Sequence, residues 1–126
     1  MEIRAFLTEV NGREFILAGA LRALGIKPTF SSGTPHHVVL LGRGEFLAHH
    51  LATGVPVIVL SPPGSREAAI EALEGGAHDH MCWPSSKGDF TVFAKELALR
   101  MTKVCERYYS AGDELGIPFM PIGDGS

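Results

Sequence analysis

Six histidines are the most conspicuous candidates for chemistry, and they occur as three close pairs. The third pair, His78 and His80, lies beside Asp79 and Cys82, which brings metal-ligating residue types together at short spacing. Alternate residues of a strand share a face, so His80 and Cys82 would point the same way. Only two or three of these side chains could gather around one ion, short of the four ligands of a closed structural metal site. We therefore expect no metal, and we interpret Cys82 as a small buried residue.

Ser61 is a candidate nucleophile at the end of an apolar run. No G-x-S-x-G elbow surrounds it, and Pro62 and Pro63 follow it directly. Residues 42–44 (Gly-Arg-Gly) would allow a phosphate to approach the backbone, with Arg43 as the charge, but three residues form a turn and no phosphate loop. We expect no catalytic residue, no cofactor and no enzyme activity. A hydrolase built on Ser61 is a third hypothesis, and it needs a base that the sequence does not identify.

Strands and helices alternate along the chain. The run at residues 56–60 (PVIVL) is apolar on both faces, as a central strand of a parallel sheet must be when helices cover both sides. Parallel neighbours require crossover helices, so the alternation predicts an α/β fold with three layers and a five-stranded parallel sheet. The expected strands are residues 3–7, 27–30, 38–41, 56–60 and 81–83, and the expected helices follow Asn11 and span residues 45–53, 65–73 and 90–108.

Composition sets the outer limits on function. The chain has 126 residues, 45% hydrophobic and 20% charged, which indicates one globular domain. Its net charge is 11 − 14 = −3 without a basic block, so we expect no nucleic-acid or membrane partner. Two cysteines, no signal peptide and no apolar run long enough to span a bilayer predict a cytoplasmic protein with reduced thiols.

The segment from Val55 to Pro84 resembles the receiver domain of two-component response regulators. Receivers have a central strand ending in Ser or Thr, a helix ending in an "ALEAGA" phrase, an acidic "DDY" and a Lys-Pro pair. Here these features are VIVLS ending at Ser61, ALEGGA at 72–77, HDH at 78–80 and Trp83-Pro84. The resemblance extends more weakly over residues 1 to about 109. It implies a flavodoxin-like sheet of order 2-1-3-4-5 and a role in two-component signal transduction and phosphorelay.

The resemblance also implies where a phosphorylation site would lie. Receivers bind Mg²⁺ with an acidic pair after the first strand, phosphorylate an aspartate after the third, and hold the phosphoryl oxygens with a hydroxyl and a lysine. In this chain the nucleophile and the lysine are missing, because glycine and tryptophan stand in their places. Aspartyl phosphorylation is therefore excluded, and the chain resembles a pseudo-receiver. The degenerate pocket would comprise Thr8, Glu9, Gly42 (or Arg43 if the register slips by one), Ser61, Trp83 and Pro84.

Two further departures from the receiver pattern carry expectations. Only residues 31–36 separate the second and third strands, too few for a crossover helix, so the second helix is expected to be missing or reduced. The exposed sheet face would then be covered by the tail or by a partner. Trp83 is either a ring that plugs the emptied pocket, which we favour, or an exposed anchor for a partner. The Lys-Pro bond of receivers is commonly cis, and aromatic–proline bonds favour cis.

The leading hypothesis is an atypical receiver, residues 1–109, that acts by protein–protein contact without phosphorylation. The partner would be another signalling protein, an output domain or a second copy in a homodimer. In the family, such contacts use a surface that corresponds here to residues 66–74, 80–83 and 95–107. The candidate interface residues are His80, Cys82, Lys95, Leu99 and Lys103.

The sequence leaves two alternative functions open and marks the C-terminal residues as a separate segment. A small-ligand sensor would bind at the carboxyl ends of the strands, where Glu9, Gly42, Ser61 and Trp83 would gather. A histidine-based pH response would need an exposed His80. Residues 110–126 hold three acids and no base, and form an acidic, apolar tail or the start of a linker.

Overall fold

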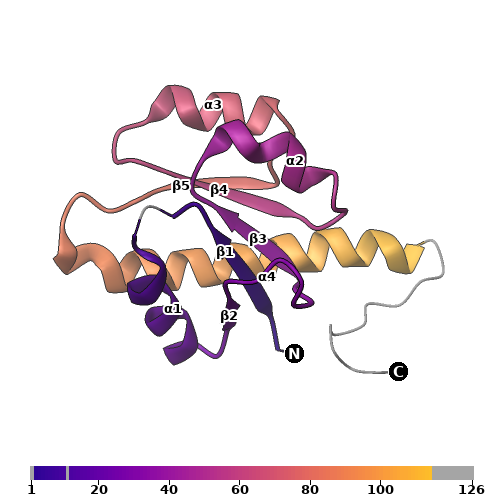
Figure 1. The fold of residues 1–126 in the computed structure, drawn as a ribbon, viewed down its shortest axis with the longest axis horizontal. Coiled ribbons are helices and arrows are strands. Elements are labelled where there is room, and N and C mark those ends of the chain that lie inside the picture. Colours follow the sequence, from indigo (N-terminus) through magenta and orange to yellow (C-terminus); the bar gives the residue numbers. More distant parts are fainter. Residues whose placement is uncertain (1, 11, 115–126) are drawn as a thin grey trace.

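Five parallel strands form one sheet in the order β2-β1-β3-β4-β5 (Figure 1). The structure is a computed structural model that describes residues 2–10 and 12–114, with side chains described as far as residue 109. The strands are β1 (Arg4–Thr8), β2 (Lys27–Thr29), β3 (Val38–Leu41), β4 (Val57–Ser61) and β5 (Asp79–Cys82). The predicted parallel sheet and its order are therefore confirmed.

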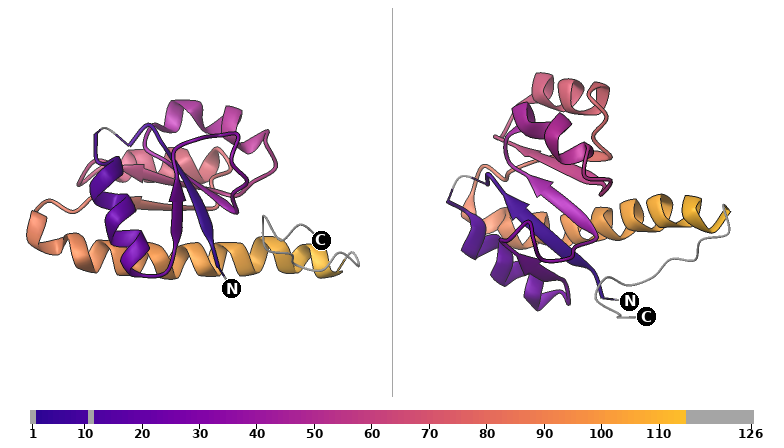
Figure 2. Two further views of the ribbon diagram at one scale, coloured as in Figure 1. Left: turned by 60° about the horizontal axis from the view of Figure 1, so that its bottom comes forward. Right: turned by 45° about the vertical axis from the view of Figure 1, so that its right-hand side comes forward.

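Helices cover both faces of this sheet. They are α1 (Glu14–Ala23), α2 (Leu47–Leu51), α3 (Arg66–Glu74) and α4 (Phe90–Glu114), with short 3₁₀ turns at Gly44–Phe46 and Lys87–Asp89. Helices α2 and α3 lie on one face, and α1 and α4 lie on the other (Figures 1 and 2). None of the described helices combines the length and apolar character needed to cross a bilayer. The three predicted layers are present.

Strand alternation divides the core into two clusters. On β3, Val38 and Leu40 join the cluster under α1 and α4, whereas Val39 and Leu41 join the cluster under α2 and α3. All residues of β3 and β4 are buried, because both faces of these central strands are covered. This burial on both faces explains the continuous apolar runs in the sequence.

The second helix of the receiver pattern is missing, as predicted. Residues 30–37, all of which the structure describes, contain a turn and no helix between β2 and β3. The sheet face there is nevertheless covered: the rings of His36 and His50 lie 5.1 and 6.1 Å from the ring of Phe6, which is 7% exposed. A cavity of about 400 Å³ remains between this turn and α2. A loop side chain, His36, and a helix side chain, His50 of α2, thus replace part of the missing helix.

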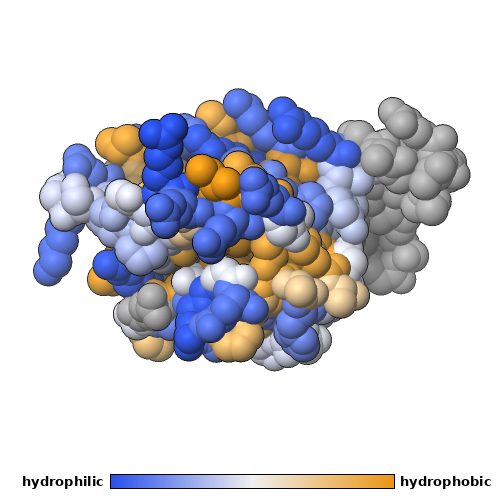
Figure 3. Space-filling model, turned by 90° about the horizontal axis from the view of Figure 1, so that it is seen from above, coloured by the Kyte–Doolittle hydropathy of each residue, from blue (hydrophilic) through white to orange (hydrophobic). Residues whose placement is uncertain are grey.

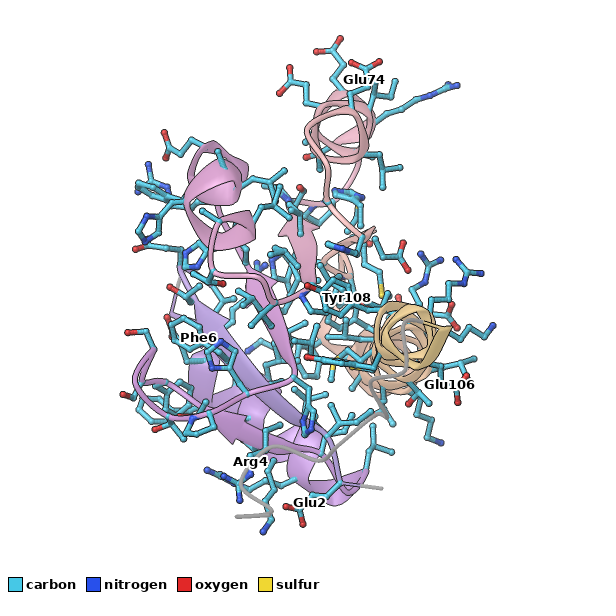
Figure 4. The ribbon with its side chains drawn as sticks, turned by 90° about the vertical axis from the view of Figure 1, so that its right-hand side faces the viewer. Glu2, Arg4, Phe6, Glu74, Glu106 and Tyr108 are labelled. Carbon is cyan, nitrogen blue, oxygen red and sulfur yellow. The ribbon has the colours of Figure 1, made fainter. Side chains whose placement is uncertain are left out.

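Two histidines join neighbouring strands at the amino edge of the sheet. His37 Nδ1 accepts the Arg4 N–H at 3.0 Å, and His78 Nδ1 accepts the Val57 N–H at 3.1 Å. The rings of Tyr109 and Tyr108 on α4 lie against His37 and His78 respectively. Figure 4 shows Tyr108 pointing from α4 toward the sheet, whereas Glu106 points away from it. These contacts hold the last turns of α4 on the domain.

The final helix is longer than the sequence pattern predicts. Helix α4 continues through Gly112 to Glu114, so it passes both the glycine expected to break it and the domain boundary placed at residue 109. The start of the predicted tail is therefore helical backbone. Residues 115–126 lie outside the described part of the chain, and the tail stays a prediction there.

Candidate functional site

The carboxyl ends of β1 and β3 meet where a receiver carries its phosphoacceptor. The Gly42 N–H donates to the Thr8 carbonyl oxygen at 3.0 Å. A Cβ added at Gly42 would lie 1.9 Å from the Glu9 carbonyl oxygen and 2.7 Å from the Val10 Cα. Backbone atoms cannot give way as a flexible side chain does. The space in which an acceptor side chain would begin is therefore filled by the chain that leaves β1.

Glu9 is held in an unusual backbone conformation at this point. Its φ is +58°, the left-handed region, and Glu9 is the one residue other than glycine with a positive φ in the described part of the chain. This conformation costs about 1 to 2 kcal/mol for an L-residue with a side chain. The turn that it allows directs the Glu9 carbonyl oxygen toward Gly42. The left-handed conformation of Glu9 brings its carbonyl oxygen against residue 42, and residue 42 must be glycine because a Cβ there would clash with that oxygen.

The carboxylate of Glu9 lies beside the guanidinium of Arg43. Arg43 Nη1 lies 4.0 Å from Glu9 Oε2, and Arg43 also pairs with Glu45. Within the described residues, no group of three or more His, Cys, Asp or Glu side chains is placed to hold a metal ion. The Mg²⁺ site of the receiver pattern needs several oxygen ligands, and a single carboxylate beside an arginine does not fit it. Thr8, half-buried at the end of β1, adds no charge.

Ser61 and His80 form a buried pair that the sequence analysis did not predict. The Ser61 hydroxyl and His80 Nε2 are 2.8 Å apart, and the two residues are 5% and 8% exposed. His80 thus supplies the base that the hydrolase hypothesis lacked. The signal was present in the pattern, because His80 pairs with Val59 in register and shares a sheet face with the next-but-one residue of β4.

The surroundings of this pair do not favour hydrolysis. The Asp79 carboxylate accepts from the His80 backbone N–H and from Arg100, and not from the imidazole ring. Pro62 and Pro63 offer no N–H groups beside the hydroxyl for an oxyanion. The adjacent cavity of about 280 Å³ is lined by Glu45 and Glu71, whose charge opposes a developing oxyanion. Ser61 and His80 therefore connect β4 to β5 through a hydrogen bond.

Burial of histidines predicts a pH-dependent stability. Burial lowers the pKa of His80 and of His37, which are 8% and 0% exposed. The unfolded chain then binds protons at a higher pH than the folded chain does, so stability is complete above the ordinary histidine pKa and decreases as the pH falls below it. We expect a lower melting temperature at about pH 5.5 than at about pH 7.5.

The His80 contribution can be separated in this titration. His80→Gln keeps a side-chain donor for Ser61 and removes the titrating group, so its melting temperature should depend less on pH. The exposed His49 provides the matched control, and His49→Gln should keep the wild-type slope. Equal slopes in the wild type and in His80→Gln would contradict this assignment. Because His80 is buried, the exposed ring required for the predicted pH response is not found.

Trp83 is buried on the α1/α4 side of the sheet. It is 3% exposed, and its ring lies 5.1 Å from Phe93 and 6.5 Å from Phe90. The Arg13 guanidinium lies 4.8 Å above the ring. Trp83 is thus a core residue, and the interpretation as an exposed anchor is wrong. The bond to Pro84 is trans, contrary to the expectation of a cis bond, as are the other peptide bonds in the described residues.

Comparison with solved structures identifies the architecture. The receiver domain of the Francisella response regulator 1452 is 18% identical, with a TM-score of 0.66 over 83% of this chain and 98% of that one. The BeF₃-activated DrrB receiver domain is 19% identical, with a TM-score of 0.60 over 85% and 100% of the two chains. This chain has the receiver fold. No family model matches its sequence, and no curated protein matches it.

Longer receiver-fold proteins also align with this chain. NtrX from Brucella abortus, solved in complex with ATP, is 16% identical with a TM-score of 0.76. The alignment covers 98% of this chain but only 31% of NtrX. The chain therefore corresponds to about a third of that protein's length.

The receiver fold separates some of the residues predicted to form one interface. His80 is buried and contributes almost no surface, and Cys82 is half-buried. Leu99 lines a groove with Leu24 on the α1 side of α4, whereas Arg100 reaches Asp79 on β5. Lys95 and Lys103 are exposed on α4. Lys95, Leu99 and Lys103 are spaced four residues apart and therefore lie on one exposed side of α4, whereas the buried His80 adds almost nothing to this surface.

The receiver fold also separates the residues of the predicted small-ligand pocket. Ser61 lines a cavity of about 280 Å³ beside α3, and Trp83 lines another of about 380 Å³ beside α1. Gly42 is closed off by the backbone of Glu9 and Val10. The four residues expected to gather around one ligand therefore lie at different places along the carboxyl edge of the sheet.

Proposed function

We propose that this chain is an atypical receiver domain that is not phosphorylated on aspartate and that acts in signal transduction through protein–protein contact. The observation that carries the proposal is the close approach of the Glu9 and Val10 backbone to Gly42. A phosphoacceptor side chain has no room there, and no magnesium site stands beside it among the described residues. The fold retains the receiver scaffold, whose exposed surfaces remain available for contact with another protein. The proposal includes no enzyme activity and no cofactor.

Helix α3 offers a surface suited to such contact. Ile70 and Leu73 are 50% and 53% exposed, one helical turn apart, on the helix that packs beside edge strand β5. Seen from the side of α2 and α3, apolar surface lies among hydrophilic residues (Figure 3). Apolar side chains surrounded by polar ones are the usual composition of a protein interface. Next to β5, Arg100 of α4 bridges Asp79 and Glu96 and adds a charged rim.

The proposed contact can be tested by capture and by self-association. The double variant Ile70→Asp, Leu73→Asp should lose captured partners, or lose the wild-type dimer in sedimentation, because carboxylates cannot be buried at an apolar contact. Val92 is 69% exposed on α4, and Val92→Asp is the matched control that should behave as the wild type does. Capture and self-association that are the same in all three proteins would overturn the assignment to α3.

A further inference from the structure

The cavity beside Trp83 differs chemically from three others in the described part of the chain. The cavity near the missing helix is lined by histidines and apolar residues, and the one beside Ser61 has glutamates. A third, between α4 and the turn after α1, has no charged residue in its lining. The cavity beside Trp83, about 380 Å³ in volume, combines aromatic rings with two cations, Arg13 and Lys87. Aromatic and cationic groups together favour a particular class of ligand.

Aromatic and apolar side chains form the wall of this cavity. The rings of Trp83 and Phe90 are nearly parallel, with 13° between their planes, and Phe93 supports Trp83 from the core. Pro84 and Ile16 extend the apolar lining, and Ile16 is 62% exposed. Trp83 is 3% exposed and the Arg13 guanidinium lies 4.8 Å from its ring centroid, so Trp83 supports the wall from the core and Phe90, Pro84 and Ile16 form the accessible part. A supported wall is preorganised and would lose little side-chain entropy on binding. A flat, apolar ring system would fit against it.

The two cations at the rim have no acidic partner. In the described part of the chain, neither Arg13 nor Lys87 lies within 4.0 Å of a carboxylate, although six other such pairings occur. Glu14, next to Arg13 in the chain, accepts from the Gly12 N–H at 3.3 Å, and Asp89, two residues from Lys87, accepts from the Ser86 hydroxyl at 3.3 Å. Ser85 also lines this cavity. An anionic group would find two unpaired positive charges there and a hydroxyl donor.

The position in the fold agrees with a ligand site. The cavity lies where β5 ends and α1 begins, at the carboxyl edge of the parallel sheet. Ligands of open α/β folds bind outside this edge. The volume is near the lower end of the range for small-molecule pockets, about 300 to 1,000 Å³, which limits the ligand to one or two fused rings.

We propose that this cavity binds a small planar aromatic anion. The ring system lies against Phe90, Pro84 and Ile16, and the carboxylate or phosphate pairs with Arg13 and Lys87. The site is independent of the surface on α3. The cavity lies next to the degenerate phosphorylation pocket. Trp83, which stands where receivers carry the lysine, is the one position that the two share.

The experiment uses the single tryptophan, whose indole N–H gives one resonance in a ¹H–¹⁵N spectrum. The full chain is titrated with 2-naphthoate and 2-naphthyl phosphate, and with neutral 2-naphthalenemethanol as the matched probe. We expect a saturable shift with one or both anions, and the tighter one identifies the anionic group. The neutral probe should bind about tenfold more weakly.

Charge-removing variants locate the site. Arg13→Gln and Lys87→Gln should each weaken binding of the better anion by about tenfold, and Lys103→Gln, on an exposed part of α4, should leave it unchanged. Melting temperatures establish that the variants are folded. No saturable shift with either anion, or equal affinity for the anion and the neutral probe, would overturn the proposal. Arg13→Gln removes a group that contacts the Trp83 ring, so Lys87→Gln is the decisive variant. Wild-type affinity in Lys87→Gln would also overturn the proposal.

Discussion

Gly42→Ala is expected to destabilise the protein by about 3 kcal/mol or more, although it adds one methyl group. The added Cβ would lie 1.9 Å from the Glu9 carbonyl oxygen, closer than any van der Waals contact. The clash is with backbone, so relief requires β1 and β3 to separate or the turn after β1 to move. Either movement disturbs the hydrogen bond from Gly42 N–H to the Thr8 carbonyl oxygen and the paired ends of two central strands.

The matched control for this substitution is two residues away. A Cβ on Gly44 would meet nothing within 4 Å, and its φ lies outside the left-handed region. Gly44→Ala should therefore change the stability by about 1 kcal/mol or less, in the stabilising direction if it has an effect. Urea unfolding of the three proteins measures the difference. Equal midpoints for Gly42→Ala and Gly44→Ala would contradict the close approach.

The same clash decides whether the phosphoacceptor can be restored. Gly42→Asp adds the Cβ and a carboxylate, so we expect an unfolded or strongly destabilised protein and no gain of phosphorylation. The substitution of the acceptor is thus accompanied by a backbone change that fills its place. Restoring the acceptor would therefore require a different backbone path after β1 as well as the acid.

The sheet could be predicted from the sequence because its signals are local. Strands β3 and β4 are continuous apolar runs, and such runs are buried on both sides in only a few architectures. The missing helix followed from counting residues 31–36. Strand β5 begins at Asp79, two residues before its predicted start. The prediction missed these two residues because Asp79 and His80 are polar and do not continue the apolar pattern of a strand. Their side chains find partners in Arg100 and Ser61, which local patterns do not show.

The candidate site was only partly predictable, because its properties depend on contacts between distant segments. The absence of an acid at residue 42 is visible in the sequence, but the approach of Glu9 and Val10 to it is not. Trp83 could be interpreted as a plug or an anchor until its burial was known. Of the predicted interface residues, Lys95, Leu99 and Lys103 share an exposed side of α4, whereas His80 is buried, because its ring bonds to Ser61, a long-range contact that the resemblance does not show.

The absence of aspartyl phosphorylation is the central claim, and it predicts an all-or-none result. The charges that would stabilise phosphoryl transfer are missing: Trp83 replaces the lysine, and Glu9 pairs with Arg43. The remaining hydroxyl, on Ser61, is bonded to His80. Without an acceptor carboxylate and without charges that stabilise the transferred phosphoryl group, phosphorylation should not be detectable on any practical timescale.

The direct measurement is intact mass spectrometry of the full chain after incubation with acetyl phosphate and Mg²⁺. A receiver domain that retains its acceptor aspartate, treated in parallel, shows that the phosphodonor is active. The account predicts that this chain keeps its unmodified mass while the control gains one phosphoryl group. A stable phosphoryl adduct on an aspartate of this chain, located by peptide mapping, would contradict it.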